Sequence, residues 1–336
     1  MGNAKRINIG EFFIVLAALL VASLGSAYLP LLLVAVPLPA IYAWQRFGVG
    51  AGLAFTVLSV LLPCLVFSWL WALLGIPVVL VSCVCGIAIK KRARPFLSIA
   101  CACGGAMVGL GAIMGAVALM TGTDFLSAVT SQLLGYAEES FAGSAILYAM
   151  VGSMEVAQGN MSAIVFLQNL ATWSHEQMAA YVTEPAGVDA LRAVLANSLP
   201  SLGVSYAVAS GLLGYLAPRA LAKRRGCSVA PIPSFGGFIL PRSVAPYFVI
   251  SFILGEVALL AQWTQLYFAA YALLAVTQWA FSIQGLSLIY WFLLPKVKSK
   301  GICWFIVILV GIFFLSIVMW VGLLEQLIRI RERQRN

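Results

Sequence analysis

Residues 96–120 read FLSIACACGGAMVGLGAIMGAVALM, an apolar run of 25 residues without a charged side chain. A helix that crosses a bilayer needs about 20 consecutive apolar residues, so this run predicts a transmembrane helix. Its small residues recur at four-residue intervals, with Gly105 and Gly109 as one such pair. Because small residues at that spacing let helix backbones approach closely in a membrane, the stretch predicts a packed helical bundle.

The rest of the chain shares this apolar character. Of its 336 residues, 62% are hydrophobic and 9% are charged, compared with about 45–50% and about 25% in soluble domains. Eight further apolar runs predict spans at residues 11–27, 29–44, 49–69, 71–89, 191–216, 244–261, 267–294 and 302–323. We therefore expect an all-α fold, a polytopic transmembrane helical bundle with eight or nine spans, and a bend at Pro200.

Lysine and arginine are absent from the 97 residues between Arg94 and Arg192, which hold seven of the eleven acids. The basic residues form short clusters outside this gap, at residues 5–6, 90–94, 219–225, 296–300 and 329–335. Since cytoplasmic loops are enriched in Lys and Arg, we expect a membrane protein with a cytoplasmic N-terminus. Short clusters at helix ends indicate contact with membrane lipids and not with nucleic acid.

Residues 121–190 differ from their flanks, because their apolar runs at 142–155 and 161–173 are short. Runs of 10–14 residues are more often interfacial or re-entrant than spanning. We expect three parts: helices 1–5 in residues 1–120, an extracytoplasmic or re-entrant helical cap in 121–190, and the remaining helices in 191–336.

The C-terminal topology poses a conflict. A single helix at 302–323 cannot separate two basic clusters, 296–300 and 329–335, that both face the cytoplasm. Either the last helix does not span, or the 267–294 run is broken and re-entrant, or one cluster lies outside.

Polar side chains in or beside the apolar runs are the candidate ligand-binding residues. A carboxylate in a bilayer is costly and usually faces a cavity or a partner, which favours Glu256, with Gln262 six residues later. An interfacial glutamate is the equally weighted alternative. The other candidates are Glu155, Gln158, Asn160, Gln278 and Gln284. Interhelical hydrogen bonds or a solvated outer surface are the alternative roles for these residues.

The first helix repeats the small-residue spacing. Ala18, Ala22 and Ser26, together with Gly105 and Gly109, are therefore candidate helix-docking residues. With one histidine, and with Cys-X-Cys pairs whose members diverge by about 200° on a helix, we expect no metal site. No Walker A, G-X-S-X-G or H-E-X-X-H motif is present. We expect no cofactor, no catalytic residues, no intrinsic ATPase and hence no enzyme.

Three C-terminal segments carry a family resemblance: FGGFILP at 235–241, QGLSLIYWFL at 284–293 and GLLEQLIRIR at 322–331. They resemble the YybS-like bacterial membrane proteins, also called the DUF2232 family, which often has an aspartate where this chain has Glu325. That family is distantly similar to the S-components of energy-coupling-factor transporters, which capture a ligand and dock on a transmembrane coupling subunit through small residues of the first helix. Such docking would involve Ala18 and Ala22.

The resemblance implies a transporter-like, substrate-capturing subunit of a bacterial inner membrane. We expect it to bind a small or amphiphilic solute in the outer half of the bundle, near Glu256, Gln262 and Glu155. More spans and a 70-residue insertion distinguish this chain from a minimal S-component. The alternatives are a non-transporting scaffold or regulator of cell-envelope synthesis and, third, a lipid-interface enzyme. A ligand-sized outer cavity, a filled bundle, or a carboxylate pair facing lipid headgroups would distinguish the three.

Overall fold

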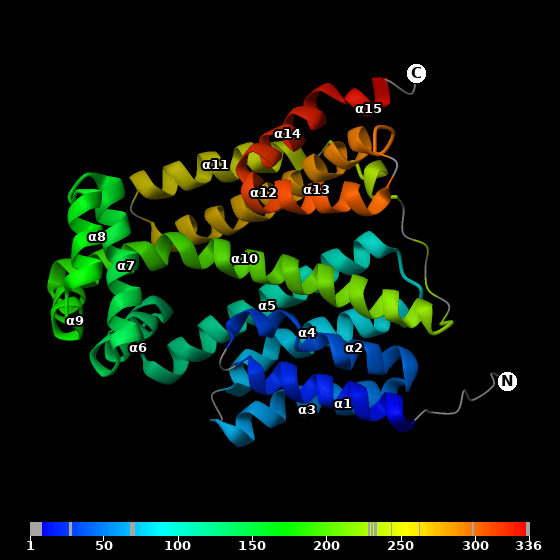
Figure 1. The fold of residues 1–336 in the computed structure, drawn as a ribbon, viewed down its shortest axis with the longest axis horizontal. Helices are drawn as coiled ribbons and strands as arrows, with labels where there is room; N and C mark the ends of the chain where they lie inside the picture. The colour runs from blue at the N-terminus through cyan, green and yellow to red at the C-terminus, as the bar shows by residue number, and fades with distance from the viewer. Residues whose placement is uncertain are drawn as a thin grey trace. The chain divides into compact units, whose positions relative to one another are not determined.

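A computed structural model of the chain describes residues 9–26, 29–67, 71–227, 229, 231, 234–242, 244–261, 263–297 and 299–333. Throughout these ranges the regular elements are helices (Figure 1), which confirms the all-α prediction. The chain divides into two compact units. Unit 1 comprises Met1–Gly109 and Gly203–Asn336, and unit 2 comprises Leu110–Leu202.

Five helices of the described ranges are long and apolar enough to cross a membrane. They are α3 (Val49–Val66), α4 (Trp71–Lys90), α5 (Pro95–Thr121), α10 (Pro185–Arg224) and α12 (Thr264–Leu293). A bent pair of helices near the C-terminus would make six. Two further apolar helices, α1 (Ile9–Gly25) and α11 (Val244–Leu260), have 17 residues each. The predicted number of eight or nine spans stays a prediction, because it depends on whether these shorter helices also cross the membrane.

The run at 29–44 is not the single helix that its hydrophobicity predicts. It contains a short 3-10 helix, η1 (Pro30–Val34), followed by α2 (Pro37–Arg46). Proline lacks a backbone N–H and clashes with the preceding turn, so it starts helices more readily than it continues them. Both elements begin at a proline, which explains the break. Pro200, by contrast, does not interrupt α10, which runs for 40 residues.

The run at 302–323 is also broken, so the prediction of one helix there is wrong. Helix α13 (Lys300–Phe313) and helix α14 (Leu315–Ile328) meet at 109°, with non-helical backbone angles at Phe314. The chain therefore turns back, and α13 begins near the same end of unit 1 at which α15 (Ile330–Arg333) lies (Figure 1). If the two helices form a re-entrant pair, both basic clusters face the same side of the membrane. Helix α12 is continuous, so the alternative of a broken 267–294 run is wrong.

Unit 2 contains the predicted cap segment. Its helices are α6 (Phe125–Glu139), α7 (Phe141–Gln158), α8 (Ala163–Thr172) and α9 (His175–Thr183), with parts of α5 and α10. Each of the four helices is preceded by a capping residue whose side-chain oxygen accepts a hydrogen bond from a backbone N–H of the first turn. These capping residues are Asp124, Ser140, Ser162 and Ser174 respectively. Such caps satisfy donors that a helix start leaves unpaired. A core around Tyr148, Met178 and Leu191 holds the helices together.

Candidate functional site

A groove of about 700 Å³ lies in unit 1 between α1, the start of α2 and the end of α10. Its floor and walls are mostly apolar, and several positions are small: Ala18, Ala22, Ala35 and Ala217. On α1 the lining residues recur every three or four positions from Glu11 to Ala22, which places them on one helix face. Ligand pockets of about 300–1,000 Å³ with few polar groups are typical of small-molecule sites.

Charged and polar groups gather at one end of this groove. The Glu11 carboxylate, 8% exposed, accepts a hydrogen bond from the Tyr42 hydroxyl and a 3.0 Å bond from Arg46 Nε. Arg225 Nε lies 3.8 Å from the same carboxylate, and Arg224 also lines the groove. Glu11 is in the first turn of α1, where a negative charge interacts favourably with the helix dipole.

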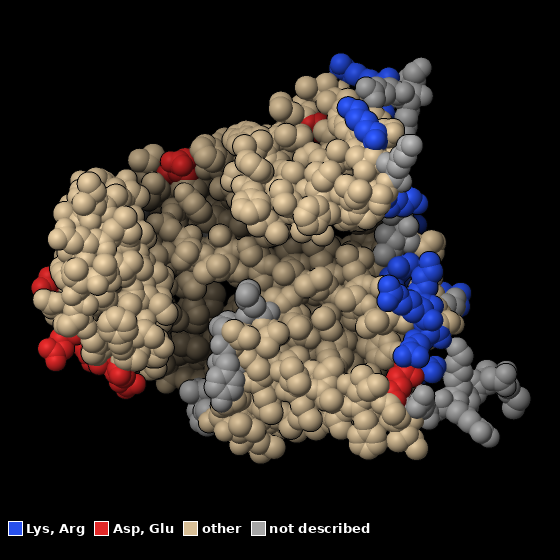
Figure 2. All heavy atoms as spheres, viewed as in Figure 1, with Lys and Arg blue, Asp and Glu red and all other residues tan. Residues whose placement is uncertain are grey.

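The same end of unit 1 carries most of its basic residues. Figure 2 shows Lys and Arg side chains gathered there, and Figure 1 shows the end of α4, the end of α10 and the start of α13 at that end. These helix ends carry Lys90, Lys223, Arg224 and Lys300. The groove is therefore amphipathic along its length, with cations at one end and alanine-lined apolar walls at the other.

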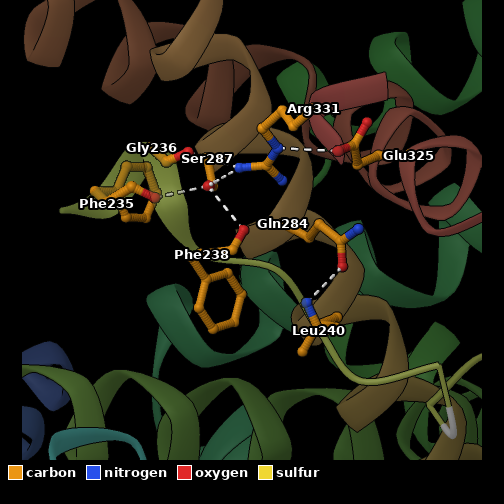
Figure 3. A network of polar contacts seen from close by, with 8 residues as sticks. All are labelled: Phe235, Gly236, Phe238, Leu240, Gln284, Ser287, Glu325 and Arg331. Carbon is orange, nitrogen blue, oxygen red and sulfur yellow. Dashed lines mark hydrogen bonds and ion pairs between the residues drawn. The ribbon is translucent and has the colours of Figure 1, made fainter. Parts of the chain in front are cut away.

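A second polar site of unit 1 is buried and filled. Arg331, on α15 after α14, and Glu325, on α14, form an ion pair with a 2.9 Å Nε–Oε1 distance, and each side chain is 2% exposed. The same guanidinium donates to the Gly236 carbonyl at 2.8 Å and to the Ser287 hydroxyl at 2.9 Å (Figure 3). Ser287 in turn donates to the carbonyl oxygens of Phe235 and Phe238.

Two glutamines extend this polar network. Gln284 Oε1 accepts the backbone N–H of Leu240 at 3.2 Å, and Gln326 Nε2 donates to the Pro241 carbonyl at 2.6 Å. The three segments that carry the family resemblance thus meet at one place: the 235–241 loop, α12 and α14 with α15. We call these contacts the C-terminal network. Four buried polar atoms of this network have no hydrogen-bond partner among the described residues: Glu325 Oε2, Arg331 Nη2, Gln284 Nε2 and Gln326 Oε1. The bonds that are made tie α12, α14 and α15 to the 235–241 loop.

The predicted ligand-binding residues of unit 1 lie apart from the groove. Glu256 is exposed on α11, Gln278 is half-buried on α12, and Gln262 falls outside the described residues. Gln284 is buried in the C-terminal network and bonded to the loop. Across the described part of the chain, no three His, Cys, Asp or Glu side chains are grouped to hold a metal ion.

The predicted ligand-binding residues of unit 2 are Glu155, Gln158 and Asn160, and they have different surroundings. Glu155 accepts a hydrogen bond from the Tyr181 hydroxyl, beside the ring of Tyr148. Burial and the Glu155 carboxylate raise the pKa of Tyr181, so this phenol stays protonated. Gln158 and Asn160 are exposed and bonded to each other at 3.2 Å. This pair and the Glu155 carboxylate therefore have different partners.

The predicted helix-docking residues have two kinds of surroundings. Gly105 and Gly109 pack inside unit 1, where a Cβ at Gly105 would lie 3.5 Å from Leu80 and one at Gly109 would lie 2.6 Å from Pro77. Ser26 and Ala22 are buried, whereas Ala18 is exposed. Ala18 and Ala22 both line the groove.

Sequence reasoning missed the groove's polar end and most of the C-terminal network. Glu11 is one of four acids outside the Arg94–Arg192 gap, and its position at the start of an apolar helix was the available signal. Arg225 is 214 residues away in the sequence, so their proximity had no local signal. Glu325 and Arg331 are only six residues apart, but the turn between them, with Arg329 at φ 54°, hides that pairing.

Comparison with known proteins identifies a family and no individual relative. No curated protein and no solved structure matches the chain. A family model described as "Predicted membrane protein (DUF2232)" matches residues 14–172 and 186–324, which include most of α1, all of α12 and most of α14. The match covers most of the chain and agrees with its apolar helices, so the protein belongs to the DUF2232 family of predicted membrane proteins.

Proposed function

We propose that this protein is a transporter-like, substrate-capturing membrane subunit that binds an amphiphile in the groove of unit 1. The observation that supports this is the groove itself, with about 700 Å³ of space, alanine-lined walls and a polar end. Apolar sites with a few polar groups at one end suit molecules that have an apolar body and a polar head. In this proposal the subunit has no ATPase of its own and is no enzyme, so the energy for transport comes from an ion gradient or from a coupling partner in the membrane.

The proposed location is a bacterial inner membrane, with the N-terminus and the groove's charged end on the cytoplasmic side. The gathering of Lys and Arg at one end of unit 1 supports this orientation. The groove then opens towards the cytoplasmic leaflet, whereas Glu256 and Glu155 suggested an outer site from the sequence.

The test is native mass spectrometry of the full-length protein released from membranes. The wild type should carry a bound amphiphile, and Ala18→Leu should lose it because the added side chain fills the groove. The matched control is Ala17→Leu, at an exposed position of the same helix that does not line the groove. A wild type that never carries an amphiphile, or an Ala18→Leu variant that keeps it, would contradict the proposal.

A scaffold role is the second candidate, and the C-terminal network favours it. Buried polar contacts there tie α12, α14 and α15 to one loop. If the groove instead receives a helix of another membrane protein, Ala18→Leu should remove a co-purifying protein while the wild type contains no amphiphile.

A further inference from the structure

The groove's two ends differ in charge as well as in polarity. Its charged end has two guanidinium groups near one carboxylate, Arg46 behind the lining and Arg225 within it, and Arg224 also lines the groove. The Glu11 carboxylate is bound by Tyr42 and Arg46, and both of these partners are mostly buried. This end therefore carries a positive balance of charge.

The position of Arg225 suits exchange of its anionic partner. Its side chain is 62% exposed, and its Nε–Oε1 distance to Glu11 is 3.8 Å, against 3.0 Å for Arg46. Exposed ion pairs with long separations contribute little to stability. Arginine also binds carboxylate and phosphate oxygens in a planar, two-pronged geometry that suits oxyanions. An incoming oxyanion can therefore contact Arg225 while Glu11 keeps Arg46.

The groove's length matches half of a bilayer. Along α1, Glu11 and Ala22 mark its two ends, and eleven residues of helix rise ~16 Å. The hydrocarbon core of one leaflet is half of ~30 Å. An acyl or isoprenyl chain that enters with its head at the arginines would thus extend over the full apolar length of the groove.

From the charge, the exposed arginine and the length, we infer that the groove takes an anionic amphiphile of the leaflet on the basic side. Its phosphate or carboxylate head lies at Arg224 and Arg225, and its single hydrocarbon chain lies along Ala18 towards Ala22. This inference rests on the proposed function, because it names the class of molecule that the same groove captures.

The experiment measures equilibrium binding of dodecyl phosphate to the full-length protein in phosphatidylcholine nanodiscs. Dodecanol, dodecyltrimethylammonium and inorganic phosphate are the comparison probes. Dodecyl phosphate should bind at least ~10-fold more tightly than dodecanol, and inorganic phosphate should bind weakly. Replacing both arginines (Arg224→Gln with Arg225→Gln) should reduce dodecyl phosphate to the affinity of dodecanol, because the contacts to the oxyanion are lost.

Two matched controls separate local from general effects. Lys223→Gln removes a charge from the same helix end but not from the groove, so dodecyl phosphate affinity should stay unchanged. Ala18→Leu should weaken binding at least ~10-fold, whereas Ala17→Leu should not. Circular dichroism and the melting temperature show that each variant is folded.

The outcomes distinguish the two claims. Equal affinity for dodecanol and dodecyl phosphate, unaffected by the arginine substitutions, would overturn the anionic class and leave the amphiphile groove standing. Complete competition by inorganic phosphate, with no effect of Ala18→Leu, would reveal a site for free phosphate and overturn the role of the chain. If no amphiphile binds saturably, both the inference and the proposed function fail.

Discussion

Gly285 of α12 and Gly322 of α14 pack backbone against backbone where the two helices cross. A Cβ atom on Gly322 would overlap the carbonyl oxygen of Phe281, and one on Gly285 would overlap that of Val318. Gln284 and Ser287 of α12 and Gln326 of α14 all hydrogen-bond to the 235–241 loop. The close approach of the two helices lets side chains from both reach this loop.

Gly322→Ala should destabilise the C-terminal half of unit 1. The added methyl group cannot be accommodated without moving a backbone carbonyl, and overpacking of this kind costs about 1–3 kcal/mol or more. Thermal unfolding of the detergent-solubilised protein should show a clear drop in melting temperature. Gly50→Ala on α3 is the matched control, because a Cβ there meets nothing within 4 Å. Equal melting temperatures for both variants would contradict the tight crossing.

Arg331 and Glu325 should behave as one energetic unit. Arg331→Met alone leaves the Glu325 carboxylate buried without its counter-ion, and loss of one partner of a buried pair costs about 3–5 kcal/mol. The double variant with Glu325→Met should be more stable than either single variant. A double-mutant cycle from SDS-titration unfolding measures this coupling.

Arg333→Gln provides the control for that cycle, since this neighbouring arginine is exposed. Its substitution should change stability by less than ~0.5 kcal/mol. Additive effects of the two methionine substitutions would mean that the buried pair contributes no coupling.

The bend between α13 and α14 predicts which side the C-terminal basic clusters face. In a background without the native cysteines, Ser299→Cys and Arg333→Cys should react with a membrane-impermeant maleimide from the same side. Lys223→Cys, at the end of α10, provides the reference: it shows from which side of the membrane the basic helix ends of unit 1 are labelled. Labelling of Ser299→Cys and Arg333→Cys from opposite sides would mean that α13 and α14 cross together as one broken span.

The start of α6 should make unit 2 sensitive to acid. Asp124 accepts the Ser127 backbone N–H at 2.8 Å, and hydrogen bonds from the Ser127 hydroxyl and N–H hold its pKa below the ordinary value of 3.8. A lowered folded-state pKa stabilises the fold above the unfolded pKa, and this stabilisation is lost as pH falls through the folded value. At neutral pH, Asp124→Ala should cost about 0.5–2 kcal/mol.

That cost should shrink as pH falls through the folded-state pKa of Asp124, because the wild-type carboxylate is then also protonated. Hydrogen exchange of the α6 amides at pH 7 and pH 3 measures the difference. Asp189→Ala, which removes an exposed carboxylate within α10 instead of a cap, should leave α6 exchange unchanged at both values. A pH-independent cost of Asp124→Ala would contradict the capping role.

Local patterns were sufficient for several helices. The runs at 49–69, 71–89, 96–120 and 267–294 correspond to α3, α4, α5 and α12 within a few residues, because hydrophobic length is itself a local property. The prolines of the 29–44 run and the capping residues Asp124 and Ser174 were also readable signals for breaks and helix starts.

The groove and the break at Phe314 depend on contacts that no local pattern contains. Glu11 and Arg225 meet only because α1 packs beside the end of α10, 214 residues later. Glu256 was predicted to bind a ligand because a charge within an apolar run is costly. That rule predicts an energetic cost, but it does not predict which residue or ligand the carboxylate contacts. Phe314 has neither a proline nor a glycine beside it, so its run reads as one helix.

The C-terminal network also limits when this part of the protein can finish folding. Arg331 binds the Gly236 carbonyl across 95 residues of sequence, and a ribosome that adds about 5–20 residues per second needs about 5–20 s for that stretch. Until Arg331 emerges, the carbonyls of the loop and the side chain of Ser287 lack their cation. Because polar groups without partners are costly in lipid, we expect the loop and α12 to reach their final packing only after the last helices have been made.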